Sequence, residues 1–356
     1  MRRSRIALVI IMAGAVALAA CQAASGRLEA EKANCPSAGS LPIKGEEREW
    51  NNVKAQASFV SAEDLAQILA QYPAAGSPAQ ESPSAQSLEA AQASPSIQAV
   101  QSAKTGQLTE TGGRSGRLQG KRIVAGVLPH HLVAGTMIME LLEHVAAQEP
   151  EVLVLIGPNH YNQGGRIITG LADWQTPLGL VKTEKSLVCS LLEQREVVRD
   201  EKILGKEHSV GNLMPLIKHF LPATPVVPVI LHYGVSLTEV DQLLDRLQAA
   251  LQDKRAVLLA SVDFSHYLTR EEAQEKDRFT LQVMRDFDYA TLFRLDNAYL
   301  DSPASLAGAL RWAERAGIKN FHILGNTNSG VLFRDDKMAT TSYFNLLFFE
   351  TYLGHK

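Results

Sequence analysis

The sequence predicts a three-layer α/β/α domain around a central, largely parallel or mixed sheet, and two observations support this. Short apolar runs such as 152–158 are rich in Val, Leu and Ile and end in turn-forming residues, which is typical of strands buried on both faces. Segments with apolar residues at helical spacing lie between these runs. Strands that alternate with helices form a sheet that helices cover on both sides.

The first half of the predicted domain has strands at 122–129, 152–158 and 166–170 and helices at 131–148 and 184–194. The first two strands and the helix between them form a βαβ unit, so we expect parallel strands and a right-handed crossover. Residues 173–179 are rich in turn formers. A helix is predicted at 210–220, with Asn212 as its N-cap and Pro215 in its first turn.

The second half has strands at 225–231, 256–262, 320–326 and 340–350 and helices at 238–253, 271–286 and 303–316. The last helix has Ser302 as its N-cap, Pro303 at its first position and Gly317 after its end. We therefore assign residues 121–356 to one α/β domain.

Residues 1–21 predict a lipoprotein signal peptide. A basic start precedes an apolar stretch, and Leu-Ala-Ala-Cys at 18–21 is similar to the bacterial lipobox, in which the cysteine is lipidated. The stretch is shorter than the roughly 20 residues of a bilayer span. We expect an extracytoplasmic, membrane-anchored bacterial lipoprotein held through Cys21, with an uncleaved anchor helix as the alternative.

Residues 22–120 are predicted to be a tether. One helix is expected within 51–72, with Ser61 as its N-cap. Residues 73–120 are dominated by Ala, Ser, Gln, Gly and Pro and contain too little apolar surface to offset the entropy cost of folding, so we expect disorder there.

The composition limits the partners and the redox chemistry. A net charge of −3, with no Lys/Arg cluster beyond the N-terminus, excludes a nucleic-acid footprint. Three cysteines are too few for a disulfide framework or a cysteine-based zinc site. Once Cys21 is acylated, Cys35 and Cys189 are able to pair in an oxidising compartment. We favour a free Cys189, because it lies on the apolar side of a helical pattern.

Polar clusters follow three predicted strands and precede one predicted helix, and they contain His130, His131, His160, Glu207, His208, Asp263 and His266. If the strands at 122–129, 152–158 and 256–262 are parallel, their carboxyl ends share one edge of the sheet, where such folds bind ligands. The clusters then surround one pocket. Each cluster alone has a simpler interpretation, such as a helix entry or a turn that closes a strand.

The residue types in these clusters fit a metal. Neutral imidazoles bind Fe, Zn or Cu, and two histidines with one carboxylate form the site of non-haem Fe(II) oxygenases. His130 and His160 are the best ligand pair. Asp301 is the candidate third ligand, and its alternative role is to stabilise the N-terminus of the helix at 303–316.

Other residues near the site are candidates for catalysis. We expect His208 and His266 to act as acid or base groups, with Glu207 and Asp263 beside them. A serine hydrolase centred on Ser265 is disfavoured, because adjacent serine and histidine side chains do not easily meet and no Gly-x-Ser-x-Gly turn is present.

The motifs PHHLVAG, LIGPNH, EHS, SVDFSHY, DSPASL and TNSG, in this order between about Arg122 and Phe349, resemble the Memo family. That family is called AmmeMemoRadiSam system protein B in bacteria. Its fold is similar to the class III extradiol (LigB-type) dioxygenases. The resemblance implies that His130 and His160 match the first two metal positions and that His266 matches the acid/base histidine. His208 lies in the family's Glu-His-Ser motif.

The chain departs from the family at the third ligand, where better-studied relatives carry a cysteine and this chain has Asp301. A carboxylate makes the site harder, which favours Fe(II) or Zn over Cu. The family name implies AmmeMemoRadiSam partners inside the cell, and the lipobox argues against that partnership.

The sequence therefore predicts a membrane-anchored metalloprotein with one divalent metal ion and an oxidoreductase activity, similar to the extradiol dioxygenases, on an unknown small substrate. Two alternatives stay open. One is a non-catalytic metal-binding or scaffolding lipoprotein. The other is a zinc-dependent hydrolase, in which the metal lowers the pKa of a water molecule.

Overall fold

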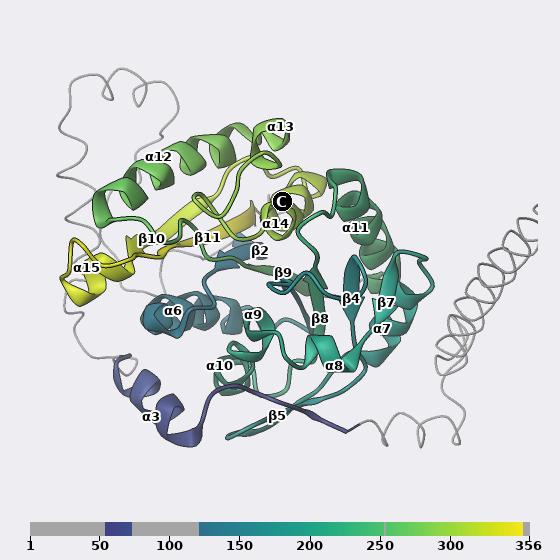
Figure 1. Ribbon diagram of the computed structural model, residues 1–356. Helices are drawn as coiled ribbons and strands as arrows, with labels where there is room; N and C mark the ends of the chain where they lie inside the picture. Colours follow the sequence, from purple (N-terminus) through teal and green to yellow (C-terminus); the bar gives the residue numbers. More distant parts are fainter. Residues whose placement is uncertain (1–53, 73–120, 253, 352–356) are drawn as a thin grey trace, which may run out of the picture.

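The computed structural model describes residues 54–72, 121–252 and 254–351. The predicted signal peptide, Cys21 and most of the predicted tether lie outside these residues. In the described part, a mixed eight-stranded sheet has helices on both sides, which confirms the predicted α/β/α architecture (Figure 1). Among the described helices, none combines the length and the apolar character that a membrane crossing requires.

The strand order in the sheet is β10-β11-β2-β9-β3-β8-β4-β7. These strands are β2 Lys121–Leu128, β3 Val152–Pro158, β4 Ile167–Thr169, β7 Val197–Arg199, β8 Val226–Leu231, β9 Ala256–Ser261, β10 His322–Asn328 and β11 Ser342–Thr351. The central strands β2, β9, β3 and β8 are parallel to one another. Next to them, β11 is antiparallel to β2 and β4 is antiparallel to β8. The parallel centre gives one edge at which several strands end together.

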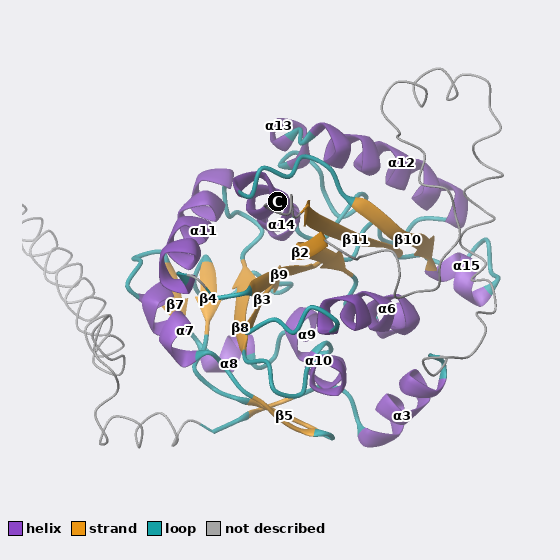
Figure 2. Ribbon diagram, turned by 180° about the vertical axis from the view of Figure 1, so that it is seen from behind, coloured by secondary structure: helices purple, strands orange, loops and turns teal. Residues whose placement is uncertain are grey.

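Two apolar clusters fill the two faces of the sheet (Figures 1 and 2). One face is covered by α7 Lys185–Leu192, α11 Leu237–Leu251, α12 Arg270–Asp286, α13 Tyr289–Leu292 and α14 Pro303–Arg315, and the other by α6 Gly135–Ala146 and α10 Met214–Phe220. Along β3 the side chains alternate: Val154 and Ile156 join the first cluster, whereas Leu153 and Leu155 join the second. Because both faces are apolar, the strand reads as one continuous apolar run. Each fully buried aliphatic side chain contributes about 1.5–3 kcal/mol to stability.

The helix expected within 51–72 is confirmed as α3 Ala62–Ala70, and Ser61 caps it by accepting a hydrogen bond from the Asp64 amide at 3.0 Å. This segment packs against the domain. Its Leu65 and Ile68 are buried in the same cluster as α6 and α10. The short strand β1 Gln56–Ala57 pairs with β5 Trp174–Thr176, which pairs with β6 Gly179–Val181. The folded part therefore includes residues 54–72, which we call the strap, and begins before Lys121.

Two glycines allow the strap to approach closely. A Cβ atom at Gly211 would clash with the ring of Phe59, and one at Gly205 would clash with the side chain of Gln56. The Gln56 amide also donates to the Glu201 carbonyl at 2.7 Å. The strap thus lies against the part of the chain that carries the Glu-His-Ser motif.

The prediction of one helix over 210–220 with Asn212 as its N-cap is wrong about where the helix begins. The structure has two short helices, α9 His208–Gly211 and α10 Met214–Phe220, and Asn212 ends the first of them. Instead of capping the second helix, the Asn212 side chain donates to the His130 carbonyl at 3.1 Å. The turn-rich stretch 173–179 forms the β5–β6 hairpin. The described elements that lack a predicted counterpart are all short and include β1, β7, α8 Glu201–Leu204, α13 and α15 Ser329–Phe333. The first turn of the helix expected at 131–148 is the 3-10 helix η2 Leu132–Ala134.

The interpretation of Cys189 as a free thiol is wrong. Cys189 is buried in α7, as the apolar pattern indicates, but it is disulfide-bonded.

Candidate metal centre

The predicted polar clusters lie together at the carboxyl edge of the parallel strands. His130 follows β2, His160 follows β3 and Asp263 follows β9, and the three strands are parallel with β9 in the middle. Asp301 joins them from the loop before α14, where Ser302 caps the helix by accepting from the Ser305 amide at 3.1 Å. The topology therefore brings together residues that are far apart in the sequence.

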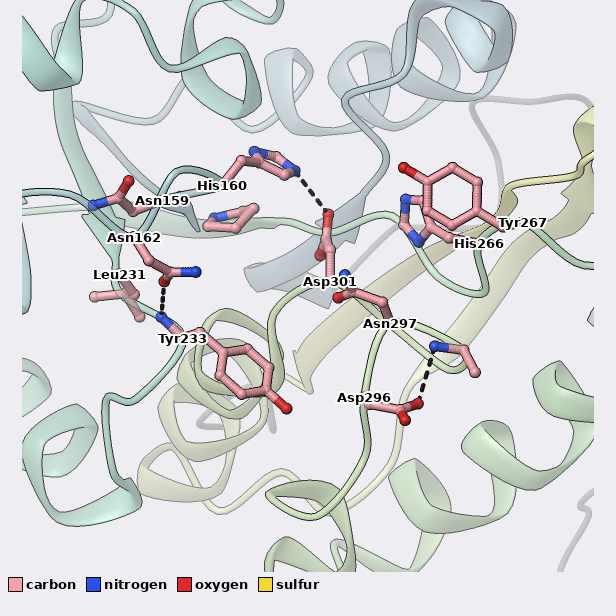
Figure 3. Close-up of a pocket in the computed structure, with 12 residues that line it drawn as sticks. Asn159, His160, Asn162, Leu231, Tyr233, His266, Tyr267, Asp296, Asn297 and Asp301 are labelled. Carbon is pink, nitrogen blue, oxygen red and sulfur yellow. Dashed lines mark hydrogen bonds and ion pairs between the residues drawn. The ribbon is translucent and has the colours of Figure 1, made fainter.

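Asp301 lies between the two histidines that were predicted as ligands. Its Oδ2 atom is 3.3 Å from Nε2 of His130. The same atom is 3.6 Å from Nε2 of His160, a contact that Figure 3 marks with a dashed line. Ligand atoms about 2.1 Å from a metal stand about 3.0–3.4 Å apart at octahedral and tetrahedral angles. The spacing around Asp301 is close to that range.

The hydrogen bonds around His130 define its tautomer. Nδ1 of His130 lies 3.0 Å from the hydroxyl of Ser261, and that hydroxyl donates its proton to the Ser209 carbonyl at 2.6 Å. The hydroxyl can therefore only accept from His130, so Nδ1 carries the proton and Nε2 has a free lone pair. Burial, together with the charge of His160, holds the pKa of His130 well below its ordinary value, so the ring is neutral.

The lone pair on Nε2 of His130 faces two carboxylates. Asp301 Oδ2 is 3.3 Å away and Asp263 Oδ2 is 3.5 Å away. Asp263 is held in place because its Oδ1 accepts from the His130 amide at 3.1 Å. Nε2 of His130 and the Oδ2 atoms of Asp263 and Asp301 are thus close together in a buried place, and Nε2 carries no proton that it could donate to either carboxylate.

His160 is held by a carboxylate. Its Nδ1 donates to Glu207 Oε1 at 2.7 Å, and Glu207 also accepts from the amides of His160 and Ser209 at 2.9 and 3.0 Å. Burial lowers the pKa of His160, but the hydrogen bonds to Asp301 and Glu207 outweigh it and raise the pKa to about 10. Burial raises the pKa of Glu207, and the contacts with His160 reverse this to a net lowering.

His208 also lies at the centre, on its solvent side. Its ring stacks on that of His160 with centroids 4.1 Å apart, and its Nδ1 is 3.3 Å from Glu207 Oε1. Burial and the charge of His160 lower the pKa of His208.

Two sets of three potential ligand atoms lie within 4.8 Å of one another: His130, His160 and His208, and His130, Asp263 and Asp301. His130 belongs to both sets. The predicted combination of His130, His160 and Asp301 joins them, because Asp301 Oδ2 contacts both histidines. The structure thus supports a possible His/Asp metal site for a divalent ion, with more candidate ligands than the sequence predicted.

Asp301 is an unusual carboxyl group. Burial raises its pKa to about 7, the hydrogen bond from His160 opposes this shift, and the charge of Asp263 adds to it. Its Oδ1 atom is buried without a hydrogen-bond partner. Burial likewise raises the pKa of Asp263. A cation between these groups would offset the cost of burying two carboxylates together.

His266 lies at the other side of the cavity. Its amide donates to the Asn297 carbonyl at 3.0 Å, and its ring Nδ1 is buried without a partner. Burial lowers the pKa of His266, opposed in part by the charge of Asp263. The ring is therefore neutral at neutral pH and able to accept a proton.

A cavity of about 430 Å³ opens next to these groups. His160, Asp301 and His266 line it, and its outer walls include Asn162, Tyr233, Tyr267 and Asn297 (Figure 3). Tyr233 and Tyr267 are 53% and 82% exposed, so aromatic rings border the entrance. The volume suits a small organic molecule.

Sequence reasoning missed three residues that support the site. Ser261 lies inside an apolar run, and Ser209 stands beside the more prominent Glu207 and His208. Tyr343 is fully buried, and its hydroxyl lies 2.7 Å from Nδ1 of His131. A polar residue within an otherwise apolar strand is the signal that would have identified Ser261.

The fold and this cluster define an α/β protein with a histidine–carboxylate centre at the carboxyl edge of its sheet. Residues 94–345 match the family described as Memo-like protein, and the chain belongs to that family.

Relatives of known sequence support this assignment. A MEMO1 family protein of Pyrobaculum aerophilum is 28% identical over 242 residues, which cover 65% of this chain and 85% of that protein. A MEMO1 family protein of Metallosphaera sedula is 30% identical over 180 residues, covering 49% of this chain and 64% of that protein. Among solved structures, an uncharacterised protein of Escherichia coli K12 aligns with a TM-score of 0.43 and 15% identity, over 63% of this chain and 99% of that one.

Proposed function

We propose that this protein is a membrane-anchored Memo-like metalloprotein that binds one divalent metal ion through His130, His160 and Asp301 and acts as an oxidoreductase on a small organic substrate. One observation carries the proposal. The free lone pair of His130 Nε2 faces the carboxylates of Asp301 and Asp263 at 3.3 and 3.5 Å. Unless a cation or a proton lies between them, these atoms repel one another in a buried site.

The ligand types favour particular metals. Two imidazoles and a carboxylate with open positions suit Fe(II), and Zn is the second choice. Copper(I) prefers sulfur ligands, and among the described residues near the centre there is no free thiol.

The residues behind the ligands support this assignment. Ser261 and Glu207 each accept the Nδ1 proton of one histidine, which leaves both Nε2 atoms directed at Asp301. Such outer partners are typical of metal-binding histidines. Glu207 is only 1% exposed and its hydrogen bonds are filled, so we assign it a positioning role.

The chemistry divides between the ion and the protein. A bound metal would supply Lewis acidity and, if it is iron, redox chemistry. His266 would accept a proton from a substrate in the cavity, because its ring is neutral and the residue lines the cavity. His208 would handle a proton on the solvent side, where 40% of its side chain is exposed.

The proposed anchor rests on the lipobox and on one structural observation. Cys189 is disulfide-bonded, which fits an oxidising extracytoplasmic compartment. The same observation weighs against intracellular AmmeMemoRadiSam partners for this chain.

A zinc-dependent hydrolase is the second candidate, and one observation favours it. The nitrogen atoms of His130, His160 and His208 lie within 4.8 Å of one another, and three histidines form a known catalytic zinc set. The metal identity separates the two candidates.

The test is elemental analysis of the full-length protein, purified in detergent under anaerobic conditions without added metal. We expect about one iron per chain, lost in Asp301→Ala and retained in Asp245→Ala, an exposed carboxylate that pairs with Arg315 outside the site. Zinc in place of iron would favour the hydrolase. No metal in either protein would refute the proposal.

A further inference from the structure

A buried hydrogen-bond network connects helix α12 to the turn that carries Asp263 and His266, and the proposed function does not use it. It starts at Asp277 in α12, passes through Ser342 at the start of β11 and ends at Ser265. Asp277 is 3% exposed, and both serines are fully buried. Buried polar groups of this kind are costly unless they are fully hydrogen-bonded.

Each polar atom of this network has a partner. The Ser342 hydroxyl donates to Asp277 Oδ1 at 2.5 Å, and Asp277 Oδ2 accepts from the Asn326 amide at 2.8 Å. With its single proton committed, the Ser342 hydroxyl accepts from the Ser265 amide at 3.0 Å and from the Ser265 hydroxyl at 2.8 Å. The direction of every bond therefore follows from the Asp277 carboxylate.

The hydrogen-bond network ends at Ser265, on the turn that carries two candidate site residues, Asp263 and His266. Two backbone bonds also hold this turn to β11: the Phe264 amide donates to the Ser342 carbonyl and the Ser342 amide to the Ser265 carbonyl, both at 2.9 Å. The side-chain hydrogen bonds thus reinforce the contact with β11 at Ser265, the residue before His266.

The next residue of β11 contacts a second histidine turn. The Tyr343 hydroxyl lies 2.7 Å from Nδ1 of His131, beside His130. Asn326, which donates to Asp277, also donates to the Tyr343 carbonyl at 3.1 Å. The start of β11 therefore links both turns to Asp277.

We infer that Asp277 is a positioning residue of the metal centre, which acts through Ser342 to fix the turn that carries Asp263 and His266. The inference deepens the proposed function and rests on it for the role of His266. An asparagine cannot keep both bonds in their present directions. With its oxygen toward Ser342, its NH₂ faces the NH₂ of Asn326, and with its oxygen toward Asn326, its NH₂ donates to Ser342 and reverses the hydrogen bond between the two serines. Burial raises the pKa of Asp277 to about 7, opposed by the bonds from Asn326 and Ser342, which shows how far this carboxyl lies from solvent.

The test compares Asp277→Asn with Thr280→Val in the full-length protein. Thr280 is fully buried on the same helix, and its hydroxyl donates to the Lys276 carbonyl at 3.0 Å, outside the network. The readout is the set of imidazole ¹⁵N and ¹³C resonances of His266, identified by their loss in His266→Gln. This readout needs neither a substrate nor a bound metal.

We expect Asp277→Asn to shift or broaden the His266 resonances by more than their linewidth and to leave those of His219, on α10, unchanged. Thr280→Val should lower the melting temperature without moving the His266 resonances. If Asp277→Asn lowers the melting temperature and leaves the His266 resonances in place, Asp277 is merely structural and the inference is wrong.

Ser342→Ala is the second variant, because it breaks the same link without burying a new amide. It should reproduce the effect on His266 even if Asp277→Asn does not fold, and an unchanged His266 signal in Ser342→Ala also overturns the inference. The two hypotheses fail separately. A protein without metal refutes the proposed function and leaves the NMR readout intact, whereas unchanged His266 signals in metal-loaded protein refute only the positioning role.

Discussion

His130 follows strand β2 and His160 follows strand β3 at the same edge of the sheet, yet their pKa values shift in opposite directions. His130 is buried against the neutral hydroxyl of Ser261, and its pKa is lowered; His160 donates to the carboxylate of Glu207, and its pKa is raised to about 10. The residue type and the strand position are the same. Burial and the charge of His160 keep His130 neutral, whereas the hydrogen bonds to Asp301 and Glu207 keep His160 protonated.

This difference has a consequence for metal binding. His130 is ready to bind through Nε2, whereas His160 must first lose a proton to the solvent. The centre thus combines one prepared ligand with one that exchanges a proton for the metal, and each half can be perturbed alone.

The largest effect is expected for the ligands themselves. His130→Ala and His160→Ala should each abolish stoichiometric metal binding, because each removes a nitrogen that no other described side chain replaces beside Asp301. Calorimetric titration with Fe(II) or Zn(II) measures this, with circular dichroism as the check on folding. A folded variant that still binds one metal would place the ion elsewhere.

Acid should weaken metal binding next most strongly. Asp301 has a pKa raised to about 7 in the metal-free protein, and below that pH it must release a proton to bind a metal. Because His160 also releases a proton over this range, the affinity should fall about tenfold per pH unit above 7 and about hundredfold per pH unit below it. The affinity measured from pH 5 to 9 checks this, and a slope that does not steepen below pH 7 would exclude Asp301 as a ligand.

The same shift changes the stability of the metal-free protein. The folded state keeps a proton on Asp301 between its ordinary pKa and about 7, whereas the unfolded chain does not. The contribution of Asp301 to stability is therefore present at low pH and is lost as the pH rises toward 7. Urea unfolding of wild type and Asp301→Asn across this range measures it, and equal pH slopes for the two proteins would contradict the expectation.

Substitutions of Glu207 and Ser261, which accept the Nδ1 protons of His160 and His130, should have intermediate effects on metal affinity, and the two effects should differ. Glu207→Gln should reduce metal affinity by about 10–100-fold, because the histidine loses a charged acceptor. Ser261→Ala should reduce it less, since Ser261 is neutral and His130 keeps its lowered pKa. Competition against a chelator of known affinity compares the variants, and a larger loss for Ser261→Ala would reverse our ranking.

The smallest effect is expected for His208. If the ion lies between His130, His160 and Asp301, His208→Ala removes only a stacked neighbour, and the affinity should change less than about tenfold. If three histidines bind the metal, the same variant should lose binding altogether. This measurement therefore separates the two sets of ligands.

The features that could be predicted from sequence are those that local patterns determine. The apolar runs of β2, β3 and β9 were long enough to identify as strands, and their parallel order placed His130, His160 and Asp263 at one edge. The short elements β7 and α8 span three and four residues, which is too short for any periodicity to show. Asn212 was misassigned because its partner, the His130 carbonyl, is 82 residues away in the chain.

The arrangement behind the ligands was beyond sequence reasoning for the same reason. Glu207 contacts His160 across 47 residues, and Ser261 contacts His130 across 131. Such contacts depend on which strands become neighbours, and no local pattern records them. The sequence neighbours of Glu207 identify it as a site residue, but only its contact with His160 shows that it holds that ring in place.

If Cys21 anchors the chain to a membrane, as we propose, the strap defines which part of the chain determines the distance between the domain and that membrane. Because residues 54–72 pack on the domain, the stretch 73–120 leaves and re-enters the same folded body, and only the chain from Cys21 to residue 53 connects an anchored lipid to it. At about 3.4 Å per residue, that connection has a contour length of roughly 110 Å. Shortening it would bring the cavity closer to the lipid headgroups, whereas lengthening the stretch 73–120 would leave that reach unchanged.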